Sequence, residues 1–261
     1  MGRIYTLVNQ KGGVGKTTTA INLGAYLGYY GQRVLLIDLD PQANATSCLG
    51  IDKATVKNGT YEVLLGSAPI AAHIMHNPRL KISLLPSSPA LSGAEVELID
   101  QPNREYKLRE VLSTVADRYD YILIDCPPSL NLLTVNGLVA ARDGVIIPVQ
   151  CEYLALEGLG QLTQTLNKVR VKLFPELKVR AVVMTMFDGR TKLASDVVNE
   201  VKKHFPQEVL HTLIPRSIRI AEAPSYGVPI SMYAPECNGA KAYNDLTGEI
   251  LASDGINIST S

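Results

Sequence analysis

The stretch NQKGGVGKTT at residues 9–18 combines glycines, lysines and threonines in the manner of a phosphate-binding loop. Its glycines let the backbone wrap closely around phosphate groups and present amide donors to them. Lys16 is spaced to reach the β- and γ-phosphates of a nucleotide and Thr17 to ligate Mg²⁺, at the start of a helix whose N-terminus favours anions. A strand before the loop and a helix after it are the context that this motif requires. We therefore predict a nucleotide site formed by Gly12, Gly13, Val14, Gly15, Lys16, Thr17 and Thr18.

Two residues of this loop depart from the usual pattern G-x-x-x-x-G-K-[ST]. Gln10 stands where the first glycine is expected, and Lys11 adds a second lysine that phosphate binding alone does not require. A lysine on a loop usually faces solvent. Residue type alone therefore assigns no function to Lys11.

Two aspartates end the apolar segment RVLLIDLD at residues 33–40. Alternation along a strand places Asp38 and Asp40 on the same side. Attack on a γ-phosphate needs a positioned water and a neutralising metal, and a carboxylate at a strand end near the loop can serve either need. Solvated loop acids are the competing interpretation.

A third aspartate, Asp125, ends the apolar run YILID at residues 121–125, as in a Walker-B strand. Its carboxylate is expected to hold Mg²⁺, through a water molecule. Pro127 and Pro128 would end the strand, because proline cannot donate to the ladder. The competing interpretation is a capping Asp before a helix, a role that Ser129 can fill instead.

Apolar segments of strand length alternate with helical patterns along the chain, which is typical of a mostly parallel sheet covered on both faces. We predict an α/β, doubly wound fold with ligands at the carboxyl ends of its strands. Residues 42–80 are the least regular part. The expected strands lie at 3–9, 33–40, 81–88, 119–129, 143–150, 178–188 and 208–215. The expected helices lie at 16–30, 89–99, 104–117, 129–141, 153–173, 190–204 and 239–251.

Composition limits the function classes. The 261 residues include 25 Lys and Arg against 25 Asp and Glu, so a globally basic nucleic-acid binder is excluded but a local basic patch is not. The chain shows neither a signal-peptide layout nor the ~20 consecutive apolar residues that span a bilayer. The four dispersed cysteines lack zinc spacing and suggest reduced thiols in a cytoplasmic protein. We expect a single domain over residues 1–252 and a polar, flexible tail over 253–261.

The motifs KGGVGKTT, DLDPQANAT and DCPPS together closely resemble those of the ParA/Soj-type segregation ATPases. This family belongs to the deviant Walker A group, with MinD and the nitrogenase iron protein. The segments EYLALEGL (152–159), TMFDGRT (185–191) and IPRSIRIAEAPSYGVPI (214–230) extend the resemblance from residue 3 to about residue 250. It implies a P-loop NTPase fold, ATP and Mg²⁺ as cofactors, and hydrolysis of ATP to ADP and phosphate.

The resemblance also implies residue roles. Lys11 would cross a dimer interface and contact the nucleotide of the other subunit, where a cation stabilises transferring phosphoryl charge. Asp40 would orient the attacking water, Asp38 would support the metal site, and Asp125 would be the Walker-B acid. The predicted catalytic residues are Lys11, Lys16 and Asp40, the metal site is Thr17, Asp38 and Asp125, and adenine is expected near Thr185, Met186, Pro215 and Arg216.

Binding to DNA is the second implied activity. Residues 185–220 contain six basic and four acidic residues, a mild excess that composition alone would assign to a solvated surface. The resemblance implies non-specific binding of double-stranded DNA by the ATP-dependent homodimer through Arg190 and Arg219, and we add Lys192 and Arg216 as candidates. Such phosphate contacts should be sequence-blind and salt-dependent.

The implied biology is chromosome or plasmid partition, in the cytoplasm and in association with the nucleoid. A ParB/Spo0J-like partner would stimulate hydrolysis and split the dimer. The loop begins so close to residue 1 that we expect no helix-turn-helix domain ahead of it, and hence no sequence-specific operator binding.

Four alternative functions compete with this interpretation. A MinD-like membrane ATPase would need a basic amphipathic C-terminal helix, and neither Lys nor Arg follows Lys241. An iron-protein-like electron carrier would need a cluster-bridging cysteine pair, and Cys126 has no companion in a suitable motif. A metabolic P-loop ligase or kinase would need a substrate pocket, whereas the DGR and IPRSIR segments favour DNA. A ParA-like ATPase that positions another cargo would share every residue named above.

Overall fold

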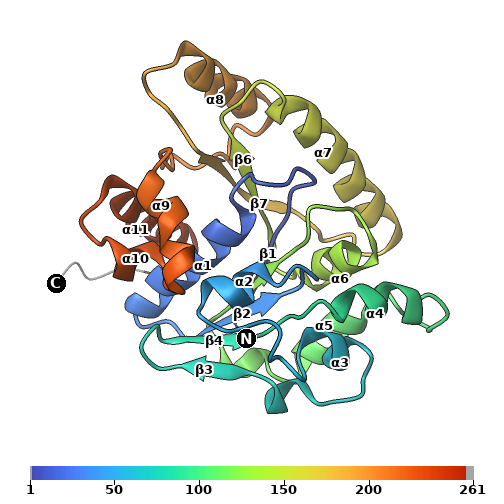
Figure 1. Ribbon diagram of the computed structural model, residues 1–261. Coiled ribbons are helices and arrows are strands. Elements are labelled where there is room, and N and C mark those ends of the chain that lie inside the picture. Colours follow the sequence, from blue (N-terminus) through green and yellow to red (C-terminus); the bar gives the residue numbers. More distant parts are fainter. Residues whose placement is uncertain (1, 257–261) are drawn as a thin grey trace.

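The computed structural model describes residues 2–256, which fold into a seven-stranded sheet with helices on both faces (Figure 1). The strand order is β3-β4-β2-β5-β1-β6-β7, and all neighbours are parallel except β3 and β4. The predicted α/β, doubly wound fold is confirmed. The strands are β1 (Arg3–Leu7), β2 (Val34–Asp38), β3 (Met75–Asn77), β4 (Ile82–Leu85), β5 (Tyr121–Asp125), β6 (Gly144–Gln150) and β7 (Val179–Thr185).

Most helices match the expected ones to within a few residues, and α2, α3, α9 and α10 are short additions in less regular segments. The helices are α1 (Lys16–Tyr29), α2 (Asn44–Cys48), α3 (Thr60–Leu64), α4 (Leu91–Glu97), α5 (Lys107–Ser113), α6 (Leu132–Ala140), α7 (Ala155–Lys172), α8 (Lys192–His204), α9 (Ile218–Glu222), α10 (Ile230–Tyr233) and α11 (Asn238–Ser253). Short 3-10 helices lie at Ile70–Ala72, Ala116–Arg118 and Ala223–Tyr226.

Two helical layers bury the two faces of the sheet. On one face, α1 and α11 pack on alternate residues of the central strands, such as Leu36 and Leu123, and α9 and α10 gather beside them (Figure 1). On the other face, α3 to α6 cover β2 and β5, while α7 and α8 cover β6 and β7. Since both faces are covered, β2 and β5 are apolar almost throughout and buried at every position.

The central strands end at one level. Leu7 of β1 and Asp38 of β2 both pair with Asp125 of β5. The loop after β1 and the acidic ends of β2 and β5 therefore meet at the carboxyl edge of the sheet, where α/β proteins bind ligands.

The strand expected at residues 208–215 is wrong as a continuous element. Only two isolated parallel bridges remain, Val182 with Val209 and Phe187 with Pro215. Between them, the Glu249 carboxylate of α11 accepts hydrogen bonds from the amides of His211 (2.6 Å) and Thr212 (3.1 Å). These two amides bond a side chain and not a neighbouring strand, so the segment does not form a continuous strand despite its apolar pattern.

The expected flexible tail begins too early. Ser253 ends α11, and the carboxylate of Asp254 accepts hydrogen bonds from the hydroxyls of Tyr5 and Tyr121, both at 2.8 Å. Arg180 forms an ion pair with the same carboxylate at 2.6 Å. Residues 253–256 therefore belong to the folded domain, and the rest of the predicted tail, 257–261, lies outside the described residues.

The structure contains neither a helix that could span a membrane nor a disulfide among residues 2–256. Among residues 2–256, none of the helices combines the length and apolarity that crossing a membrane takes. All four cysteines are free thiols.

Candidate nucleotide-binding site

The loop between β1 and α1 has the backbone that its glycines predict. Gly13 has φ of 74° and Gly15 has φ of 90°, a left-handed region that glycine enters without steric cost. A Cβ at Gly13 would meet nothing within 4 Å, so the need for glycine there comes from the backbone angle and not from crowding. The loop leads into α1 at Lys16, whose N-terminal amides face the carboxyl edge.

Neighbouring side chains fix both ends of this loop. Buried Asn9 accepts a hydrogen bond from the Lys11 amide (3.0 Å) and donates one to the Pro148 carbonyl (2.8 Å). At the other end, the Thr185 hydroxyl donates to the Val14 carbonyl (2.8 Å). Sequence reasoning missed Asn9, although its place directly after a buried strand was a usable signal. The Thr185 side chain supports the loop, and its predicted place near adenine stays a prediction.

Lys16 is a buried lysine, with 6% of the residue exposed. Its Nζ atom donates to the Lys11 carbonyl at 3.1 Å. Burial lowers the pKa of this ammonium, and the nearby Asp125, Cys126 and Asp40 oppose that shift. A buried cation among acids is suited to bind an anion of high charge, such as a nucleotide polyphosphate.

Asp125 and Thr17 form the core of the predicted metal site. The Thr17 hydroxyl donates to Asp125 Oδ2 at 2.7 Å. Asp125 Oδ1 is buried and has no hydrogen-bond partner among the described residues. Burial, followed by the neighbouring Asp38, raises the pKa of Asp125. An unpaired buried carboxylate oxygen is costly unless a cation satisfies it.

These donors fit Mg²⁺. The ion usually takes one or two protein ligands and completes its octahedron with substrate phosphates and water. Residues 2–256 contain no group of three or more His, Cys, Asp or Glu side chains that could hold a metal ion by themselves.

Asp38 and Asp40 differ more than their spacing suggested. Asp38 Oδ2 accepts hydrogen bonds from the amide (2.8 Å) and hydroxyl (2.7 Å) of Thr46, and Oδ1 accepts one from the Asp40 amide (3.2 Å). Burial raises the pKa of Asp38 to about 6 even though these bonds oppose the shift. The carboxylate of Asp38 is therefore committed to protein donors, so it holds the segment that carries Asp40. Thr46 has a role that sequence reasoning missed.

Lys11 does not extend freely into solvent. Its Nζ atom lies 3.5 Å from Glu152 Oε2, and Arg216 Nη2 lies 3.2 Å from the other oxygen, Oε1. The structure thus brings together the extra lysine of the loop and one residue of the predicted base site. Glu152 lies in the EYLALEGL segment, but sequence reasoning gave it no role.

The other residues predicted to lie near adenine lie on two cross-linked segments. The Phe187 amide donates to the Ile214 carbonyl (2.9 Å), and the Arg216 amide donates to the Phe187 carbonyl (3.0 Å), so Met186 and Pro215 are held close together. Met186 has φ of 52°, which is uncommon for a residue with a side chain. Such strain often marks a functional site.

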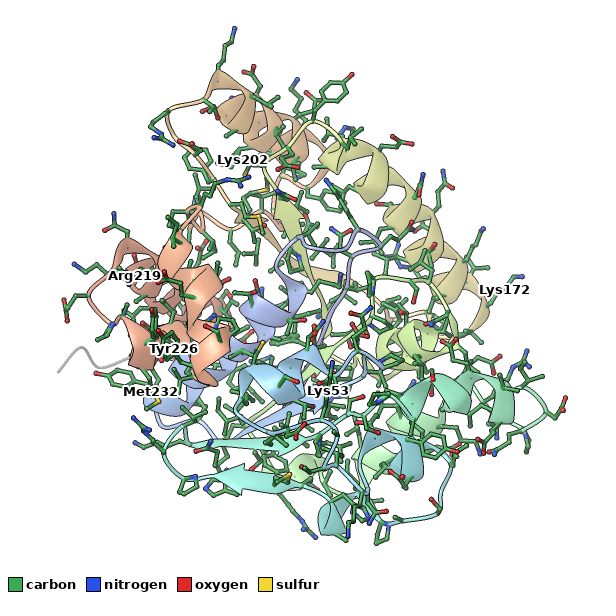
Figure 2. All side chains as sticks on the ribbon, in the orientation of Figure 1. Lys53, Lys172, Lys202, Arg219, Tyr226 and Met232 are labelled. Atoms are coloured by element: carbon green, nitrogen blue, oxygen red, sulfur yellow. The ribbon has the colours of Figure 1, made fainter. Side chains whose placement is uncertain are left out.

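The candidate DNA-binding arginines form an exposed rim on the same two segments. Arg190 makes a bidentate pair with Asp188 (2.9 and 2.7 Å), and Arg219 pairs with Glu222 (3.1 Å). Lys192 is the exposed first residue of α8. Figure 2 shows Arg219 on α9 and Lys202 on α8, well apart in this view. Arg190 and Arg216 therefore lie on the two segments that the Phe187 hydrogen bonds join, whereas Arg219 lies on α9 and Lys202 on α8.

Comparisons with known proteins agree with this geometry. The family model for the AAA domain matches residues 2–179. The chain is 50% identical over 253 residues to the sporulation initiation inhibitor protein Soj of Bacillus subtilis (strain 168), covering 97% of this chain and 100% of that protein. It is 49% identical to the chromosome-partitioning ATPase Soj of Treponema pallidum (strain Nichols), covering 98% and 99%. A crystal structure of cobyrinic acid a,c-diamide synthase from Mycobacterium smegmatis, with bound ADP and magnesium, is 37% identical, with a TM-score of 0.86 over 100% of this chain and 99% of that one.

Proposed function

Because the chain belongs to the ParA/Soj family of chromosome-partitioning ATPases, we propose that its Mg-ATP form is a face-to-face dimer that binds DNA and drives partition. The protein is an ATPase, and its cofactors are ATP and Mg²⁺. The observation that carries the proposal is the buried, unpaired Oδ1 atom of Asp125 at the end of β5. It lies beside Thr17 and Lys16 of the phosphate loop, which also carries Lys11.

Each residue of the site has a distinct task in this proposal. Lys16 and the amides of residues 12–18 bind the phosphates, while Thr17 and Asp125 hold Mg²⁺. When bound, the ion supplies charge neutralisation at the phosphates. Asp40 orients the attacking water, and Asp38 fixes Asp40 by accepting its amide hydrogen bond.

The dimer depends on Lys11. Two facing ATP molecules carry a large negative charge, and a cation supplied by each subunit to the other's nucleotide links dimer formation to ATP. Gly12 beside it carries no Cβ, so two such loops can approach closely.

Binding to non-specific double-stranded DNA would follow dimer formation. Arg190, Arg219, Lys192 and Arg216 would contact phosphates, and doubling a weak surface raises affinity through effective concentration. A ParB/Spo0J-like protein would stimulate hydrolysis and release the dimer from the nucleoid.

The test is Lys11→Ala compared with wild type and with Lys172→Ala, which removes an exposed lysine near the far end of α7 (Figure 2). We expect Lys11→Ala to bind ATP as wild type does but to form neither the ATP-dependent dimer nor the DNA complex. Sedimentation measures the dimer, and a DNA mobility shift measures the DNA complex. Normal ATP-dependent dimers of Lys11→Ala would overturn the proposal.

A second candidate function comes from the structural comparison. The solved structure at 37% identity is named a cobyrinic acid a,c-diamide synthase, and its fold matches over the whole chain. The 50% identity to Soj favours partition. The ATPase rate separates the two candidates, because DNA should stimulate a partition ATPase and cobyrinic acid should stimulate a diamide synthase.

A further inference from the structure

Glu152 is an acidic side chain shared by two cations from distant parts of the chain. Its two carboxylate oxygens form ion pairs with Lys11 (3.5 Å) and Arg216 (3.2 Å). The pairs are partly exposed, since 34% of the Lys11 side chain, 42% of that of Glu152 and 58% of that of Arg216 remain accessible. They are therefore weak enough to exchange partners.

The backbone around Glu152 is fixed, so its carboxylate has a defined place. Its amide donates to the Gln150 carbonyl at the end of β6 (2.8 Å), and its carbonyl accepts from Ala155 at the start of α7 (3.0 Å). The neighbouring Cys151 amide donates to Thr185 (3.0 Å), and the Gln150 side chain donates to the Glu152 carboxylate. Glu152 is thus held next to the phosphate loop by strands β6 and β7.

The backbone of Lys11 is fixed as well. Its amide is bound by Asn9 and its carbonyl by Lys16. Only the side chain is free to reorient. The ammonium that is proposed to reach a second subunit must therefore leave Glu152 first.

We propose that Glu152 is a positioning residue that keeps Lys11 on its own subunit until the partner's nucleotide phosphates replace it. This inference rests on the proposed role of Lys11 across the dimer interface. A nucleotide-free or isolated subunit then presents a neutralised lysine, and only a facing polyphosphate of higher charge draws the lysine away. Glu152 thereby sets how much nucleotide the dimer requires.

Arg216 completes the exchange. When Lys11 leaves, Arg216 still pairs with Glu152, so no carboxylate is left without a cation. Arg216 therefore acts on dimer formation as well as being a candidate for DNA binding.

The expected effect is moderate. Removing one exposed ion pair changes an equilibrium constant by up to about fivefold, and two such pairs break when a dimer forms. Removing Glu152 should therefore lower the dimer dissociation constant by about 2- to 25-fold.

The decisive experiment compares wild type, Glu152→Gln and Glu157→Gln by sedimentation with Mg²⁺ and a non-hydrolysable ATP analogue. Glu157→Gln makes the same change on an exposed residue in the first turn of α7. We expect Glu152→Gln alone to dimerise at several-fold lower protein concentration, with an unchanged melting temperature. Glu152→Ala should move the midpoint in the same direction. An unchanged or weaker dimer in the Glu152 variants, or an equal gain in Glu157→Gln, would overturn the proposal.

A second measurement reports on Lys11 directly. Without nucleotide, modification of its amine by an acylating reagent, followed by mass spectrometry, should be faster in Glu152→Gln than in wild type, while Lys172 reacts equally in both. Equal modification rates of Lys11 in wild type and Glu152→Gln would overturn the proposal that Glu152 holds this lysine. If Lys11→Ala dimerises normally, the proposed function fails instead, and the two failures are distinguishable.

Discussion

The phosphate site and the basic rim hold their charges in opposite ways. Asp38 and Asp125 are completely buried, and protein donors or a bound cation must satisfy them. On the rim, the Arg190 side chain is 89% exposed and that of Arg219 is 61% exposed, and each pairs with a carboxylate a few residues away. The buried site therefore holds one geometry, whereas the exposed ion pairs of the rim are weak enough to change partners.

The largest expected effect is on the buried site. Asp40→Ala should lower the rate of ATP hydrolysis by about 10²–10⁴-fold, because a water that is not oriented attacks poorly. ATP binding should persist, since Lys16, Thr17 and Asp125 are unchanged, and a dimer bound to DNA should accumulate. Phosphate release and sedimentation measure the two properties.

The control for that variant is Asp100→Ala, which removes an exposed aspartate from the turn after α4. It should hydrolyse ATP as wild type does. If the Asp40→Ala protein is monomeric and hydrolyses ATP rapidly, Asp40 does not orient the attacking water.

The second effect concerns the stability of the buried site. Thr46→Val keeps the shape of the side chain but removes the hydroxyl that donates to Asp38 (2.7 Å) and accepts from the Ser87 amide (2.9 Å). The free energy of unfolding should fall by about 1–3 kcal/mol, because a buried carboxylate loses a donor and a buried amide loses its acceptor.

Urea denaturation measures the free energy of unfolding of Thr46→Val, with Thr114→Val as the control. Thr114 is exposed and its hydroxyl donates to the local Val111 carbonyl (2.8 Å), so the loss of this hydroxyl should change the stability little. Equal stability of the two variants would mean that the network around Asp38 does not hold the site.

Local sequence patterns predicted most of the fold and of the buried site. The phosphate loop is one contiguous stretch between a strand and a helix, and Asp125 ends an apolar strand, so spacing alone places them at the carboxyl edge. The apolar strands are long enough to be recognised individually. These features need no information from distant segments.

Thr46 and Asn9 were missed although their partners Asp38 and Lys11 are close in sequence, but the larger departures from the expected fold depend on distant partners. Glu249 on α11 turns residues 211–212 out of the expected strand, and Asp254 is held by tyrosines of β1 and β5. The contact of Lys11 with Glu152 joins residues 141 positions apart. A sequence pattern shows what one segment prefers, but not which side chain from another segment will reach it.

The third effect tests the rim. Arg190→Glu and Arg219→Glu should each weaken DNA binding by the dimer roughly tenfold at low salt and flatten the salt dependence, because fewer phosphates are neutralised. Dimer formation and melting temperature should stay unchanged, since both side chains are exposed.

Fluorescence anisotropy with a labelled duplex over a salt series measures this effect. Arg79→Glu reverses an exposed charge in the turn between β3 and β4 and is the matched control. If neither rim variant binds DNA more weakly than Arg79→Glu, the DNA surface lies elsewhere on the molecule.

The smallest expected effect tests whether a DNA phosphate replaces Glu222 as the partner of Arg219. Glu222 holds Arg219 (3.1 Å) and also accepts from the Tyr233 hydroxyl (3.0 Å), so a DNA phosphate must compete with this carboxylate for the arginine. Glu222→Gln should therefore strengthen DNA binding by up to about fivefold, the worth of one exposed ion pair. Glu236→Gln, an exposed glutamate just before α11, controls for the lost charge. An equal gain in both variants would point to general repulsion of DNA, whereas a gain confined to Glu222→Gln would show that the ion pair itself restrains Arg219.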